Sequence, residues 1–275
     1  MPGAVGIFFL FLLALAAGSL STLFWIPEDD LGRGYFQTNA LIVLGLLGLA
    51  TALLLFDGVA PFGDSATAGR WAVLSALAAA FGYYAGVWRQ TWHGARLAAG
   101  LTLAAATVAL WLAGRALVVP LSALPYHQPL LAANLLTSAL VLGWAVITML
   151  LGHWYLVAPK LTFRHLIVYC WVLLGVVVAR CVAVILTLTS AGLVDRFAEP
   201  NPWRLLTGFE GQGMFFWFRI LWGLGIPLTL ALMSLSCARQ RSNQSATGIL
   251  YVLVVGVLIG EITAYYLSAT TGVPV

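Results

Sequence analysis

The sequence has very little charge. Charged residues make up 8% of its 275 residues and Lys160 is the single lysine, whereas a soluble domain carries about 25% charged residues. The 13 basic residues exceed the 9 acidic ones without forming a basic stripe, which excludes nucleic-acid binding. A hydrophobic fraction of 62% and a mean hydropathy of +0.99 indicate an all-α, polytopic membrane protein.

Motifs for common cofactors and reactions are absent as well. The three cysteines, Cys170, Cys181 and Cys237, form no CxxC, no CxxCH and no even-numbered framework, which argues against c-type haem, Fe–S clusters and a disulfide scaffold. The sequence contains no Walker A, GxGxxG, HExxH or GxSxG motif, so nucleotide binding and the commonest hydrolytic chemistries lack support. No motif assigns an enzymatic reaction to the chain.

Long apolar runs fill most of the sequence. No linker separates a second domain, so we expect residues 1–275 to form one bundle of about eight transmembrane helices. We expect the first run to be a retained span and not a cleaved signal peptide, because no positively charged segment precedes it. The runs, each about 20 residues or longer, cover 4–26, 37–57, 70–88, 97–119, 130–152, 165–191, 213–236 and 247–270.

The distribution of arginine and lysine between the loops predicts the orientation. Basic residues are enriched in short cytoplasmic loops. If the N-terminus is outside, three loop residues are external (Arg70, Arg196 and Arg204) and seven are cytoplasmic: Arg33, Arg89, Arg96, Lys160, Arg164, Arg239 and Arg241. We therefore expect an N-out/C-out arrangement in a bacterial cytoplasmic (inner) membrane.

One carboxylate lies deep in a predicted span, in the segment VLIGEITAYYL, where it is Glu261. A charged group in hydrocarbon must be paired, protonated or turned toward a wet cavity. In the N-out arrangement, Arg115, Arg180 and Arg219 fall in the same outer half of the bilayer as Glu261. Two interpretations compete: a buried ion-pair network that holds the helices in register, or a pocket for a haem propionate, lipid phosphate or anionic substrate.

Small residues and one proline stand out in three of the spans. Gly223, Gly225 and Pro227 lie close together, and a proline there removes a backbone hydrogen bond and kinks the helix. Such a break is either an ordinary kink or part of a midplane transport site. GxxxG spacings at 82/86 and 256/260 predict faces where helices approach closely.

Histidines at helix ends suggest a second candidate site. His93 and His153 end two predicted spans on the cytoplasmic side, so they are candidate haem b ligands, with interfacial packing as the default. The segment that contains His153, Trp154, Tyr155 and Lys160 could hydrogen-bond a quinone carbonyl between aromatic rings, and it equally fits an aromatic belt. His127 is expected in an external loop.

Three functions are consistent with these features. The leading hypothesis is an integral subunit of a bacterial respiratory or photosynthetic electron-transfer complex, which handles quinone with or without haem b alongside other membrane or peripheral subunits. In it, Glu261 relays a proton while Arg180 and Arg219 steady the headgroup or a propionate. The alternatives are a proton-coupled secondary transporter or channel, with Glu261 as coupling carboxylate, and a non-catalytic membrane anchor or scaffold.

Overall fold

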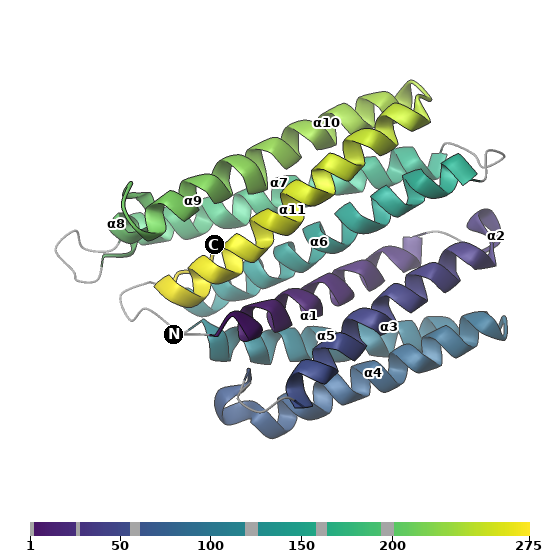
Figure 1. The fold of residues 1–275 in the computed structure, drawn as a ribbon, viewed down its shortest axis with the longest axis horizontal. Coiled ribbons are helices and arrows are strands. Elements are labelled where there is room, and N and C mark those ends of the chain that lie inside the picture. Colours follow the sequence, from purple (N-terminus) through teal and green to yellow (C-terminus); the bar gives the residue numbers. More distant parts are fainter. Residues whose placement is uncertain (1–2, 26–27, 56–60, 119–125, 158–163, 194–200) are drawn as a thin grey trace.

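The chain forms a bundle of long helices. The computed structural model describes residues 3–25, 28–55, 61–118, 126–157, 164–193 and 201–275, which contain helices and no strands (Figure 1). Within these ranges, eight segments are long and apolar enough to cross a membrane, which confirms the expected all-α, multi-pass architecture. The orientation in the membrane stays a prediction.

The first four spans lie in the N-terminal half of the chain. They are α1 (Ala4–Thr22) with η1 (Leu23–Trp25), α3 (Arg33–Leu55), α4 (Ala66–Trp88), which follows η2 (Gly63–Ser65), and α5 (Trp92–Leu117). A four-residue helix, α2 (Glu28–Leu31), lies between α1 and α3.

The last four spans contain the longest helices. They are α6 (His127–Val157), α7 (Arg164–Gly192), a segment built from α9 (Gln212–Ile220), η3 (Leu221–Gly225) and α10 (Ile226–Arg239), and α11 (Asn243–Thr271). A short helix, α8 (Pro202–Thr207), precedes α9, within the long connection that the sequence places on the external side.

The spans pack as two groups of four. One group contains α1, α3, α4 and α5, and the other contains α6, α7, α9–α10 and α11. In Figure 1 the first group lies below the second, and both ends of the chain lie at the same end of the bundle. The groups meet chiefly where α1 packs against α6.

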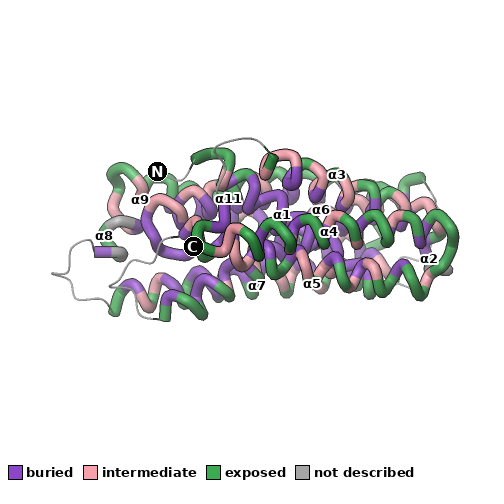
Figure 2. The backbone as a smooth tube through the Cα atoms, turned by 90° about the horizontal axis from the view of Figure 1, so that it is seen from below, coloured by how far each residue is buried: buried purple, intermediate pink, exposed green. Residues whose placement is uncertain are grey.

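The α1–α6 contact is backbone against backbone. A Cβ added at Gly18 would overlap the carbonyl of Ala139, and one added at Gly143 would overlap the backbone of Gly18. α1 is apolar on all sides and 83% of its span is buried, as expected of a helix surrounded by protein. Figure 2 shows the buried backbone concentrated in the middle of the bundle, around α1, α6 and α11.

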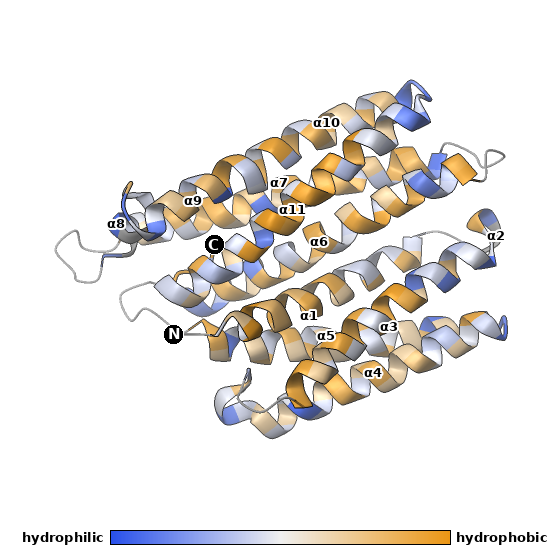
Figure 3. Ribbon diagram, viewed as in Figure 1, coloured by the Kyte–Doolittle hydropathy of each residue, from blue (hydrophilic) through white to orange (hydrophobic). Residues whose placement is uncertain are grey.

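The helices extend beyond the apolar runs that predict them. α6 begins at His127, whose buried ring donates from Nε2 to the carbonyl of Gly272 at 3.1 Å. The expectation that His127 lies in a loop is therefore wrong, since polar residues can continue a helix past the apolar segment. Figure 3 shows this pattern along the bundle, with apolar helix bodies and hydrophilic ends.

The predicted break in the seventh span is a π-helical turn. It covers Leu221–Gly225, and Pro227 occupies the first turn of α10 directly after it. Proline has no N–H to donate, so the turn before it lacks a regular partner. A change to the wider π register is a known response to such a disruption, and π turns are frequent at functional sites.

Candidate functional site

Glu261 pairs with two arginines inside the second group of helices. Arg180 of α7 donates from Nε to Oε1 at 3.1 Å and from Nη2 to Oε2 at 2.9 Å. Arg219 of α9 donates from Nη2 to Oε1 at 2.7 Å. The exposed fraction of each of the three side chains is 1% or less. We call Arg180, Arg219 and Glu261 the charge cluster.

Polar groups from α6 and the end of the chain complete the shell of Arg180. Its Nη1 donates to Oδ1 of Asn134 at 2.5 Å, and its Nη2 also donates to the main-chain oxygen of Val275 at 2.9 Å. Asn134 in turn donates to Thr187 Oγ1 at 2.9 Å. Every nitrogen of the Arg180 guanidinium therefore has a partner, and the cluster ties α6, α7, α9 and α11 together.

Sequence reasoning missed Asn134. Its amide is uncharged and stands in the apolar run LLAANLLTS, so it does not attract attention as an intramembrane charge does. The informative pattern is the spacing of Asn134 and Ser138, which places two polar groups on one face of a helix. Ser138 shares a hydrogen bond of 2.6 Å with the hydroxyl of Tyr265, one turn of α11 beyond Glu261.

Arg219 is far less satisfied than Arg180. Its Nε and Nη1 are buried and have no hydrogen-bond partner among the described residues. Among the described residues, the ion pairs of the cluster set two guanidiniums against the Glu261 carboxylate, and Arg180 also donates to a main-chain oxygen of Val275. Buried donors without partners are costly and rare, so the Arg219 side of the cluster has N–H groups available for an acceptor.

Close backbone contact positions Arg219 against α11. A Cβ at Gly260 would overlap Cα of Gly223, and one at Gly223 would lie 2.6 Å from Nη1 of Arg219. Gly256 has more room, since its Cβ would lie 3.3 Å from the nearest atom, the carbonyl oxygen of Trp222. The π turn and the predicted 256/260 glycine face thus meet directly beside the cluster.

Arg115 lies apart from the cluster. It is exposed at the end of α5 in the other helix group, with its Cζ 5.7 Å from the ring centre of Trp111. It lines a separate cavity with Asp64 and Ser65. Of the three arginines expected to bind one ligand, the structure brings together only Arg180 and Arg219 with Glu261.

His93 and His153 lie at the opposite end of the bundle from the cluster. Both are exposed, and a ring nitrogen of His153 is 3.1 Å from the hydroxyl of Tyr251. Two aromatic residues of α3, Tyr35 and Phe36, pack against the neighbours of these histidines, Trp154 and Trp92. Among the described residues, no hydrogen bond or ring contact joins His93 to His153.

Trp154 and Tyr155 have structural partners. Trp154 donates from Nε1 to the carbonyl of Leu31 at 3.2 Å, and Tyr155 is buried at 3% exposure. Lys160, expected in the same group, lies outside the described residues, as do Asp195 and Arg196. The residues of the segment therefore face different neighbours, and the charge cluster is the more concentrated set of polar groups.

The charge cluster can hold a group that accepts hydrogen bonds. Guanidinium N–H groups suit carboxylates, phosphates and carbonyl oxygens, and a low-dielectric interior strengthens such bonds. No protein-family model matches the chain, and a search of the curated proteins finds no match.

Proposed function

We propose that the chain is an integral membrane subunit that binds a quinone at the charge cluster, within a bacterial electron-transfer complex. The observation that carries the proposal is the pair of buried, unpartnered donors on Arg219, Nε and Nη1. A quinone carbonyl is a neutral acceptor that reaches such donors from the bilayer. A haem b propionate would use the same donors as a charged acceptor.

The surroundings of the cluster suit a lipophilic ring. A groove of about 350 Å³ runs between α9 and α11, lined by Met214, Phe215, Phe218 and Thr263. Its volume is within the range of small-molecule sites, about 300–1,000 Å³. The groove lies on the two helices that carry Arg219 and Glu261, but its lining includes neither residue. A headgroup bound there would reach the buried donors of Arg219 only by passing between α9 and α11.

Glu261 and the arginines have different roles in this mechanism. Glu261 orients both guanidiniums, since its oxygens accept all three of their hydrogen bonds to it. When quinol is oxidised, its two electrons pass to a partner subunit and its hydroxyl protons must leave. Glu261 takes one of the two protons when an arginine exchanges its bond from the carboxylate to the headgroup, and the second proton passes to water.

Extraction of bound lipophilic molecules tests the proposal. The complex is purified from native membranes in a mild detergent, and its solvent extract and optical spectrum are recorded. We expect a quinone, with or without a b-type absorption band, and we expect Arg219→Gln to remove it because the open donors are lost. Arg70→Gln, at an exposed arginine of α4, is the matched control and retains the ligand.

Absence of both quinone and b-type haem from the native complex would overturn the proposal. The interpretation that remains would be a membrane anchor whose cluster only fixes helix register. In that case Arg219→Gln changes thermal stability, while the partner activity per folded complex is unchanged.

The position of the π turn beside Glu261 favours a second candidate function, that of a proton-coupled transporter. Broken helices beside an intramembrane carboxylate are a common arrangement in such proteins, and here Gly223 and Gly260 are in direct backbone contact. Proton-linked uptake by reconstituted vesicles would support it. Uptake that persists in Glu261→Gln would eliminate Glu261 as the coupling group.

A further inference from the structure

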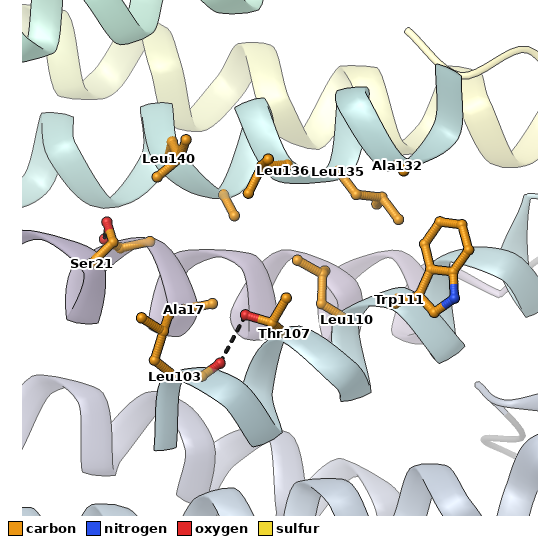
Figure 4. A pocket seen from close by; sticks show the side chains of 12 residues that line it. Ala17, Ser21, Leu103, Thr107, Leu110, Trp111, Ala132, Leu135, Leu136 and Leu140 are labelled. Atoms are coloured by element: carbon orange, nitrogen blue, oxygen red, sulfur yellow. Dashed lines mark hydrogen bonds between the residues drawn. The ribbon is translucent and has the colours of Figure 1, made fainter. Parts of the chain in front are cut away.

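A second feature, independent of the charge cluster, lies where the two helix groups meet. A groove of about 420 Å³ runs between α1, α5 and α6, and we call it the seam groove. In Figure 4 its lining extends from Ser21 and Leu140 at one end to Trp111 and Ala132 at the other. Along α5 it covers Leu103 to Trp111, about 12 Å of helix axis.

Apart from the indole N–H of Trp111 at one end, the seam groove offers hydrocarbon to a ligand. Its two hydroxyl groups are occupied by their own helices, since Ser21 Oγ donates to the carbonyl of Gly18 at 2.6 Å and Thr107 Oγ1 donates to that of Leu103 at 2.8 Å. The other lining side chains are apolar, among them Leu135 and Leu136. An alkyl chain fits these walls, whereas a polar group would lose its hydrogen bonds there.

Charged groups lie just beyond one end of the seam groove. Arg115 is one helical turn past Trp111, with its Cζ 5.7 Å from the centre of that ring. Its guanidinium shares a polar cavity of about 300 Å³ with Asp64 and Ser65. In the described part of the chain, Arg115 forms no ion pair with a carboxylate. Tryptophan and arginine side chains at such a position are typical of headgroup depth.

We infer that the chain binds one phospholipid with an amine-bearing headgroup at this place. The phosphate pairs with Arg115 and the ammonium with Asp64, which satisfies both charges of the polar cavity. One acyl chain lies in the seam groove and fills the space between α5 and α6. The lipid thereby joins the two helix groups on the side where α1 forms the floor.

The test uses the purified chain in nanodiscs that contain equal amounts of phosphatidylethanolamine and phosphatidylglycerol. After a delipidating detergent wash, native mass spectrometry counts the retained lipid. We expect phosphatidylethanolamine on the wild type, and about tenfold weaker retention in Arg115→Gln, the loss of one charge-assisted contact. Ala132→Phe, which fills the groove, should displace the lipid too.

Two controls separate the site from general effects. Ala104→Phe adds the same ring at an exposed position of α5 outside the groove, and Arg204→Gln removes an exposed arginine of α8. Both should retain the lipid. Melting curves show whether Ala132→Phe is folded. If it is not, the lipid retention of Arg115→Gln alone tests the lipid site.

Three results would overturn the inference. They are equal retention by Arg115→Gln and the wild type, a preference for phosphatidylglycerol, and recovery of an isoprenoid quinone in place of phospholipid from the seam groove. None of the residues changed in this test belongs to the charge cluster. Either of the first two results would therefore leave the quinone proposal standing, whereas a quinone in the seam groove would move the proposed quinone site away from the charge cluster.

Discussion

At the scale of single residues, the two arginines of the charge cluster are unequal. Arg180 uses Nε, Nη1 and Nη2 in hydrogen bonds to Glu261, Asn134 and Val275. Within the described ranges, Arg219 hydrogen-bonds through Nη2 alone. A fully bonded arginine contributes to stability, whereas the open donors of Arg219 are the ones that the proposed quinone would use, so experiments can separate the two side chains.

Replacing Glu261 should destabilise the bundle. Glu261→Gln leaves two guanidiniums buried with no carboxylate, and removal of one partner of a buried ion pair costs about 3–5 kcal/mol. Thermal unfolding in detergent micelles measures the loss. Glu210→Gln, at an exposed carboxylate before α9, is the control and should melt like the wild type. If Glu261→Gln and Glu210→Gln melted at the same temperature, a buried ion pair at Glu261 would be contradicted.

The matched pair Arg180→Gln and Arg219→Gln should differ in stability. Arg180→Gln leaves Asn134 and one carboxylate oxygen without their donor, whereas Arg219→Gln removes one bond together with an excess buried charge. We expect Arg180→Gln to be the less stable variant by at least about 1 kcal/mol. The same unfolding assay checks the order, and the reverse order would show that the pairing in the folded protein differs.

At the scale of helices, glycine contacts decide how closely the cluster residues approach. The π turn Leu221–Gly225 packs on α11 through Gly223 and Gly260, which lets Arg219 reach Glu261 across a short gap. Helices without side chains at the contact approach most closely. The break in the seventh span therefore serves the cluster, in addition to relieving the effect of Pro227.

Gly260→Ala should disturb this contact. The added methyl group overlaps Cα of Gly223 in η3, so η3 and α11 must move apart. We expect this to cost about 1–3 kcal/mol of stability. Gly248→Ala is the control on the same helix, where a Cβ meets nothing within 4 Å; it should be neutral or more stable by up to about 1 kcal/mol. If Gly260→Ala and Gly248→Ala lowered the melting temperature equally, the close approach of Gly223 and Gly260 would be contradicted.

At the scale of the molecule, an even number of spans places both chain ends on one side of the membrane. The charge cluster lies toward that side, since Arg180 contacts Val275, and so does Arg115 at the end of α5. His93, at the start of α5, and His153, near the end of α6, lie toward the other side. The arginine distribution predicts that the side with the chain ends is external. The apolar helices support a membrane environment, and the direction of insertion stays open to experiment.

Cysteine labelling in intact cells checks this orientation. A membrane-impermeant maleimide should label Glu210→Cys, at an exposed position between α8 and α9, without permeabilisation. Gln244→Cys, at the exposed start of α11, should react only after the membrane is opened. The opposite pattern would establish an N-in/C-in orientation and reverse the predicted sides of both sites.

Composition and apolar run length are sufficient to predict eight spans, because a chain in hydrocarbon must satisfy its backbone within helices. They also place Glu261, Arg180 and Arg219 at a shared depth, since helix rise converts sequence position into depth. They do not say which helices are neighbours. That choice depends on side-chain packing between distant segments, and it separates Arg115 from the cluster, adds Asn134 to it, and leaves two donors of Arg219 without a partner.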